Sequence, residues 1–204
     1  RRFGSLLDRY YRFPGYEPNP GLRPERTLMV LTGVEWKSGS WASSFEGYGQ
    51  LRQDAQIRPF SGPFNEGQGR IAALIHRLDF QAGAGLTLRH AATASGSRLD
   101  STGLAFPYIP GLVEVLGVGW QTAPENPLVS LSSSLRFATR AQGGSAAREI
   151  PGYGWLDLGG AVRVTRSLRA ELTIENVMDR RIELTEGFPT PGRVFSVALV
   201  GEID

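Results

Sequence analysis

The chain has 204 residues, a net charge of +2 and no cysteine, and 41% of its residues are hydrophobic. That apolar fraction supports a folded core and excludes a wholly disordered chain. The absence of cysteine excludes disulfides, thiol catalysis and cysteine-ligated zinc or iron–sulfur centres. The charges are balanced and form no basic run, so nucleic acid is not an expected partner. No stretch approaches about 18 consecutive apolar residues, which excludes a membrane-spanning helix but leaves open a transmembrane β-strand of about ten alternating residues.

Apolar and polar residues alternate with period two along most of the chain, which predicts β-strands and almost no helix. Residues 1–25 are expected to form a long loop, and the first apolar stripe follows at Leu28, Val30, Val34 and Trp36. In chain order the predicted strands cover residues 28–36, 41–54, 66–80, 85–96, 109–121, 129–137, 156–164, 168–178 and 192–202. The sequence therefore predicts an all-β fold with about nine strands.

The predicted connections alternate between short and long. Short turns are expected near residues 38–40, 82–84, 124–127 and 165–166, and long polar loops near 55–65, 97–108, 140–152 and 179–191. Short turns at one end and long loops at the other are typical of outer-membrane barrels, and several stripes are about twice as long as an ordinary globular strand. Aromatic residues lie beside the short turns, as in the belt of a membrane protein, although any β-sandwich can place aromatics at its ends: Trp36, Trp41, Phe80 and Trp120.

Three motifs, in this order along the chain, carry a resemblance to a known family. The first runs from Asn19 to Glu25, the second from Asn65 to Ile71, and the third combines residues 175–181 with 187–193. Together they resemble the C-terminal part of the barrel of TonB-dependent outer-membrane receptors. The motif positions, expected to be structural, are Asn19, Pro20, Leu22, Pro24, Glu25, Asn65, Gly67, Asn176, Asp179, Gly187, Pro189, Pro191, Gly192 and Arg193.

The resemblance implies an antiparallel meander of about nine long strands that is part of a 22-stranded transmembrane β-barrel. Residues 1–204 would then be its C-terminal portion, with an extracellular loop at 1–25 and strands from 26 to 202. It implies energy-coupled uptake of a scarce nutrient, such as a siderophore or cobalamin, across the outer membrane of a Gram-negative bacterium. The implied partners are a missing N-terminal plug, the missing barrel strands, the TonB complex through the plug, membrane lipid and a small-molecule ligand. Whether the chain is a fragment or comes from a truncated gene stays open.

Four features depart from the family pattern. The chain ends Val200-Gly201-Glu202-Ile203-Asp204, without the usual terminal aromatic, and Ile75 replaces a common Glu. Glu114 interrupts an apolar stripe. His76 and His90 would face each other on the apolar side of a hairpin centred on Gly83, either as a metal-binding pair or, as we favour, as a neutral satisfied pair.

No catalytic constellation or cofactor motif is present, so neither an enzyme nor a cofactor is expected. The best candidate for ligand binding lies in the expected extracellular loop, because stacked aromatics beside a cation suit a catecholate or metal chelate. These residues are Tyr10, Tyr11, Arg12, Phe13 and Tyr16, and the alternative is a loop that packs its own aromatics. Two other functions stay open: a soluble β-sandwich binding module with strands near six residues, and a passive porin-like channel.

Overall fold

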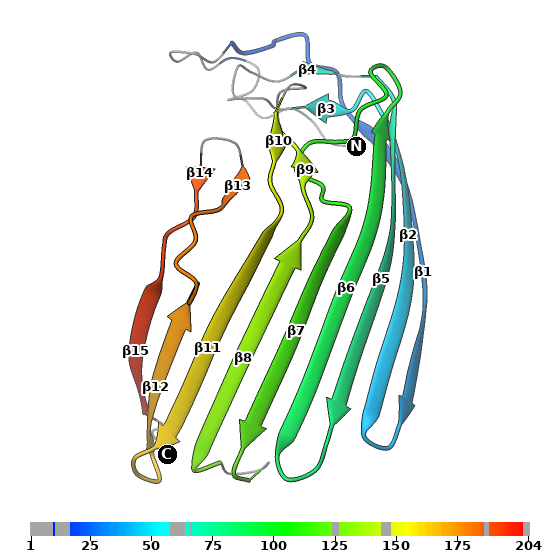
Figure 1. Cartoon of the computed structure of the whole chain (residues 1–204). Coiled ribbons are helices and arrows are strands. Elements are labelled where there is room, and N and C mark those ends of the chain that lie inside the picture. Colours follow the sequence, from blue (N-terminus) through cyan, green and yellow to red (C-terminus); the bar gives the residue numbers. More distant parts are fainter. Residues whose placement is uncertain are drawn as a thin grey trace.

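The computed structural model describes residues 10, 17–57, 64–65, 67–123, 127–143, 148–185 and 188–201. Nine long strands form one antiparallel sheet in which neighbours in space follow the order of the chain (Figure 1). They are β1 (Arg26–Ser38), β2 (Trp41–Gln53), β5 (Gly69–Gln81), β6 (Leu86–Leu99), β7 (Leu112–Gln121), β8 (Val129–Ala138), β11 (Tyr153–Arg163), β12 (Leu168–Glu175) and β15 (Val194–Gly201). The described residues include no helix with the length and apolar character to cross a membrane. The predicted nine-strand antiparallel meander is confirmed.

Every predicted strand end lies within three residues of the observed one, and two of the differences have a clear physical cause. The strand expected to reach residue 178 stops at Glu175, because Asn176 adopts a positive φ of 52° and turns the chain. The strand expected to stop at 96 continues to Leu99, which pairs with Gly69 of β5. The small residues at its end gave little local strand signal, and the long-range ladder extends it nonetheless.

Opposite residues of adjacent strands share a face, so the register divides the sheet into two faces. One row of paired residues crosses all nine strands, and seven of its nine residues are apolar. The row consists of Ser38, Trp41, Phe80, Leu88, Val118, Ser133, Leu158, Ile174 and Phe195. We call the face that carries this row the outer face. We call inner the opposite face. Its neighbouring row has no apolar side chain larger than alanine: Lys37, Ala42, Asp79, Arg89, Gly117, Ser134 and Asp157.

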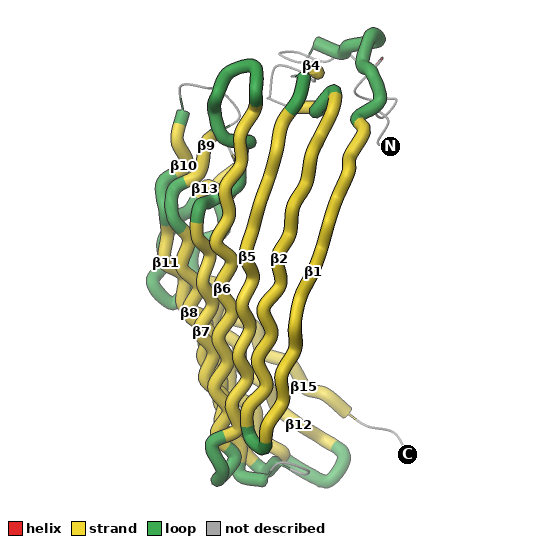
Figure 2. The backbone as a smooth tube through the Cα atoms, turned by 90° about the vertical axis from the view of Figure 1, so that its right-hand side faces the viewer, coloured by secondary structure: helices red, strands yellow, loops and turns green. Residues whose placement is uncertain are grey.

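The sheet curls into an open trough rather than closing on itself (Figure 2). A groove of about 770 Å³ on its hollow side includes inner-face residues such as Arg89, Ser132 and Glu171. The polar inner face is therefore concave and the apolar outer face convex. This is the reverse of a soluble sandwich, in which the apolar faces are packed inward.

The two ends of the trough differ. At one end, short turns join the strands, with positive φ angles at Gly39, Gly83, Ala84 and Gly85. At the other end the connections are long and carry three small two-stranded sheets, which the alternation did not predict (Figure 1). They pair β3 (Gln56–Ile57) with β4 (Phe64–Asn65), β9 (Ala141–Gln142) with β10 (Glu149–Ile150), and β13 (Glu183–Thr185) with β14 (Phe188–Pro189).

The main cluster of buried apolar residues lies at the long-loop end. It consists of Ala55, Ile71, Leu99 and Phe106, with Tyr48 and Ile109 packed against it. The Phe106 ring lies over Gly69, where a β-carbon would come within 2.6 Å of its ring atoms. The loop after β6 thus folds over the inner side of the strands.

Candidate functional site

The first motif forms a supported turn leading into β1. The Asn19 side chain accepts a hydrogen bond from the Gly21 N–H at 2.9 Å, and the Leu22 N–H donates to the Asn19 carbonyl at 3.2 Å. Leu22 is buried, Pro24 is half-buried and Pro20 is exposed. These contacts fix the direction in which the chain enters the sheet.

Glu25 is a buried carboxylate at the centre of this entry, with 3% exposure. Its Oε2 accepts the Gln56 N–H at 2.9 Å, its Oε1 accepts the Thr27 hydroxyl at 3.3 Å, and the Arg52 guanidinium lies at 3.8 Å. Buried charges are tolerated where they are paired and hydrogen bonded, as here. Glu25 therefore joins β1 to the segment that follows β2.

Substitution of Glu25 by Ala is expected to lower the free energy of unfolding of the intact barrel by about 2–4 kcal/mol. The change leaves the buried Gln56 N–H without its acceptor and Arg52 without its carboxylate. Urea unfolding in lipid vesicles, followed by tryptophan fluorescence, measures this. Glu35→Ala is the matched control, because Glu35 forms an exposed ion pair with Lys37 and its loss is expected to cost less than about 1 kcal/mol. Equal losses in the two variants would contradict a structural role for Glu25.

Asn65, from the second motif, ties together three segments at the same end. Its Oδ1 accepts the Arg23 N–H at 2.8 Å, and its Nδ2 donates to the carbonyls of Arg23 at 3.1 Å and Asp54 at 2.8 Å. Gly67 adopts a φ of 88°, and its carbonyl accepts the Ala55 N–H at 2.8 Å. The first two motifs thus meet in one hydrogen-bonded cluster, although 42 positions separate Arg23 from Asn65 in the chain.

The third motif closes the base of the last loop around Asn176, whose side chain is fully buried. Its Nδ2 donates to the carbonyls of Arg180 at 2.7 Å and Pro191 at 3.2 Å, and its Oδ1 accepts the Arg180 N–H at 3.1 Å. The Asn176 N–H itself donates to Asp157 of β11 at 2.9 Å. Both sides of the loop and a neighbouring strand therefore converge on one side chain.

The rest of the third motif reinforces this closure. The Asp179 carboxylate accepts the Arg193 N–H at 2.7 Å, and the Arg193 side chain donates to the Val177 carbonyl at 3.0 Å. A β-carbon on Gly192 would lie 2.6 Å from the Asp179 carboxylate, so a larger residue would obstruct this contact. Pro189 lies in β14, and Gly187 falls outside the described residues. The motif residues that the structure describes act on the backbone at the loop bases.

Three contributors to these bases were not among the candidates from the sequence. Gln56 is 6% exposed and donates its side-chain amide to the Arg23 carbonyl at 3.0 Å. Phe106 covers Gly69, and Asp157 accepts bonds from both Asn176 and the Trp155 indole at 2.5 Å. The only signal in the sequence was the position of Asp157 in a polar stripe, because every one of these contacts depends on long-range packing.

The inner face carries ion pairs along the length of the trough. Arg89 pairs with Asp79 at 3.4 Å, Arg169 with Glu171 at 2.5 Å, and Arg77 with Glu46. All of these side chains are at least partly exposed, so each pair adds little stability. Between these pairs the inner face carries the charged residues Arg136, Asp157 and Arg163 and many small ones: Gly117, Gly119, Ser130, Ser132, Ser134, Gly159 and Ala161. The arrangement is that of a hydrophilic, open lining.

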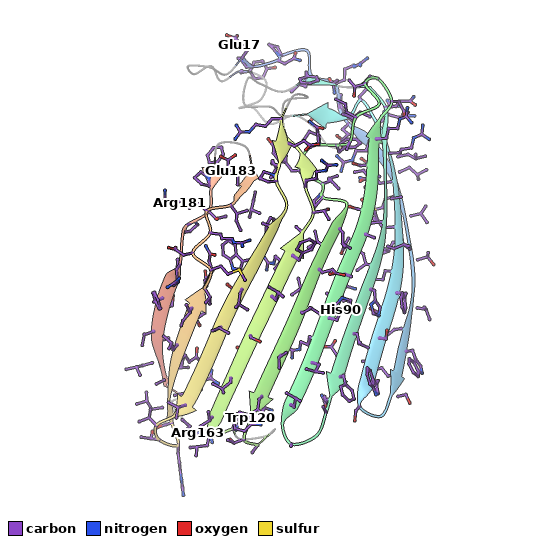
Figure 3. All side chains as sticks on the ribbon, in the orientation of Figure 1. Glu17, His90, Trp120, Arg163, Arg181 and Glu183 are labelled. Carbon is purple, nitrogen blue, oxygen red and sulfur yellow. The ribbon has the colours of Figure 1, made fainter. Side chains whose placement is uncertain are left out.

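The two histidines share the outer face, as expected, but they are not directly opposite each other. His76 pairs with Ala92, and His90 pairs with Leu78, because Gln81 pairs with Thr87 and the hairpin is therefore centred on Ala84 rather than Gly83. Their ring centroids are 5.5 Å apart, and His76 also stacks on Phe45 and shares a 3.2 Å hydrogen bond with the Ser43 hydroxyl. Figure 3 shows His90 about halfway along β6. Among the described residues, no group of three or more His, Asp or Glu side chains could hold a metal ion.

Most of the candidate ligand-binding residues lie outside the part of the chain that the structure describes. Tyr11, Arg12, Phe13 and Tyr16 lie outside the described residues, and Tyr10 is 63% exposed. Glu114 lies on the outer face in the row that includes Ala92 and His76. Ile75 lies on the inner face, opposite Thr93.

No protein-family model and no curated protein matches the sequence. Solved structures do match. The copper transporter OprC has a TM-score of 0.78 at 21% identity, over 98% of this chain and 35% of its own. The ferric-catecholate import receptor Fiu from E. coli has a TM-score of 0.69 at 14% identity, over 98% of this chain and 30% of its own. The ferric enterobactin receptor PfeA from Pseudomonas aeruginosa has a TM-score of 0.70 at 15% identity, over 91% of this chain and 32% of its own.

These proteins are transporters and receptors rather than enzymes, and at such identities the likeness establishes the fold. The chain spans about a third of the length of the structures that it matches. The match agrees with the nine-strand antiparallel meander of the sheet. The chain therefore has the fold of part of the barrel of TonB-dependent outer-membrane receptors, to which its nine long strands correspond.

Proposed function

We propose that this chain is the C-terminal barrel segment of an energy-coupled receptor that imports a scarce nutrient across the outer membrane of a Gram-negative bacterium. One observation carries the proposal: the apolar outer face continues without a break in register from β1 to β15. Its apolar side chains remain exposed, among them Leu74 at 70%. An exposed apolar face of this extent is stable in lipid and not in water.

The two edges of the sheet also support the proposal that the chain is a segment of a membrane barrel. Every residue of β1 is exposed, and within the described part of the chain β15 pairs with β12 alone. Unpaired strand edges are not tolerated in a bilayer, so further barrel strands must pair with both. A plug inside the barrel, through which the TonB complex would act, would lie against the polar inner face.

The substrate class is proposed from the matched structures, which are described as a copper transporter and as receptors for iron carried by catecholates. The test is uptake by cells in which the intact receptor is the only route, with ferric enterobactin and copper(II) chloride as separate probes. Saturable uptake of either probe that stops when a protonophore collapses the proton gradient is the expected result. Uptake insensitive to the protonophore would instead identify a passive channel and overturn the energy-coupled function.

The loop before β1 is the proposed place of ligand contact. Arg12→Ala combined with Tyr16→Ala is expected to weaken binding of the transported probe at least about tenfold, because a cation and an aromatic face would be lost. Equilibrium binding to the purified receptor measures this. Arg166→Ala removes the same charge from a short turn at the other end of the trough and serves as the control. Unchanged affinity in the double variant would remove this loop from the ligand site.

A further inference from the structure

The cations of the nine long strands are distributed unequally between the two faces. Those on the inner face are Lys37, Arg52, Arg77, Arg89, Arg136, Arg163 and Arg169, and they occur along its whole length. Those on the outer face are Arg26, Arg70 and Arg98. All three lie at the long-loop ends of their strands, and no strand of the sheet carries an outward cation near the short turns.

Each of the three outward arginines lies the same number of residues away from a large apolar residue near the short-turn end of its strand. Ten residues of strand separate Arg26 from Trp36, Arg70 from Phe80, and Leu88 from Arg98. Ten residues at about 3.3 Å each, tilted by about 40°, span about 25 Å. That height equals the apolar band of a membrane barrel, so the arginines mark one boundary of the band and Trp36, Phe80 and Leu88 the other.

Two of these arginines are directly opposite each other. Arg70 of β5 pairs in register with Arg98 of β6. Like charges in this arrangement repel each other, and an anion placed between them removes the repulsion. Within the described residues, Asp100 is the carboxylate that contacts this pair, at 3.0 Å from Arg70. One carboxylate for two exposed guanidiniums leaves further N–H donors for a second anion at this level of the outer face.

We propose that Arg70 and Arg98 bind the phosphate group of a lipid headgroup in the outer leaflet, with Arg26 as a further cation at the same boundary. Guanidinium groups bind phosphate through paired, charge-assisted hydrogen bonds, and the adjoining apolar face covers the acyl chains. Free inorganic phosphate could bind the same guanidiniums, but it has no acyl chains that could contact the apolar face. The inference rests on the proposed membrane location of the chain.

The test uses the intact barrel in nanodiscs that contain equal amounts of phosphatidic acid and phosphatidylcholine. Native mass spectrometry counts the lipids that the released barrel retains. We expect the wild type to retain phosphatidic acid preferentially, and Arg70→Gln combined with Arg98→Gln to reduce that preference at least about tenfold. Arg136→Gln combined with Arg163→Gln removes the same charge from the inner face and is expected to leave the preference unchanged.

Three results would overturn the inference. The first is an unchanged preference in the Arg70 and Arg98 variant, and the second is an equal loss in the inner-face control. The third is full displacement of the lipid by inorganic phosphate at equal phosphate concentration, which would mean that the headgroup alone is recognised. Flotation of the barrel with lipid vesicles separates the two proposals: a barrel that fails to float overturns the membrane function and this inference together, whereas one that floats without lipid preference overturns this inference alone.

Discussion

Replacement of Asn176 by Ala is expected to lower the free energy of unfolding of the intact barrel by about 3–5 kcal/mol, one of the largest effects of any single substitution in the chain. Three backbone groups that bond the buried Asn176 side chain lose their partner: the N–H and carbonyl of Arg180 and the carbonyl of Pro191. Alanine must also adopt the positive φ of 52°, which costs about 1 kcal/mol more than for asparagine. Urea unfolding in lipid vesicles measures the loss.

Two matched variants separate the causes of this loss. Asn176→Gly removes the same hydrogen bonds but accepts the positive φ, so it is expected to be about 1 kcal/mol less destabilising than Asn176→Ala. Asn19→Ala removes an asparagine cap that accepts one bond from Gly21 in a partly exposed turn, and its expected cost is about 1 kcal/mol. If Asn176→Ala cost no more than Asn19→Ala, the loop base would not depend on this residue.

Replacement of Leu74 by Arg is expected to destabilise the intact barrel by about 2–4 kcal/mol in a bilayer. Leu74 lies on the outer face, midway between Arg70 and Phe80, and its side chain is 70% exposed. In lipid, the guanidinium would lie at the midplane, where charge is most costly. The same change at an exposed position of a soluble protein has almost no effect on the free energy of unfolding. The size of the loss therefore distinguishes a lipid environment from water.

The control for Leu74→Arg is Ser132→Arg on the inner face. Ser132 is exposed and lies between Gly119 and Gly159 in its row, which leaves room for a long side chain in the trough. Its expected cost is below about 1 kcal/mol. Equal costs at positions 74 and 132 would contradict the assignment of one face to lipid and the other to water.

The strands were predictable because their signal is local. Stripes such as Leu28, Val30 and Val34 reflect the period of two that a strand imposes on a sheet with different faces. The hairpin of the two histidines shows the limit, because the register depends on the conformation of a four-residue turn rather than on any single glycine. The small sheets in the loops were missed since two or three residues carry no periodicity.

The loop bases were predictable only through the motif resemblance, which identified Glu25, Asn65 and Asn176 as structural residues. Nothing local indicates that Asn65 contacts Arg23 across 42 positions. Gln56 and Phe106 were missed for the same reason, because their roles arise when distant segments meet. The candidate ligand residues from Tyr10 to Tyr16 stay a prediction.

The central claim is that the outer face of the sheet lies in lipid and the inner face in water. It is tested most directly by measuring the environment of successive residues along one strand. Single cysteines can be placed at each position from 70 to 80 of β5 in the intact barrel and labelled with a fluorophore, and this part of the barrel has no cysteine of its own to react. Quenching by brominated lipid is predicted to be strong at even positions, including 72, 74 and 78, and weak at odd positions. Iodide in water should instead quench positions 73, 75, 77 and 79, whereas Ile71 is buried beneath the loop after β6. Quenching by iodide at both sets of positions, with none by brominated lipid, would contradict the claim that the outer face lies in a membrane.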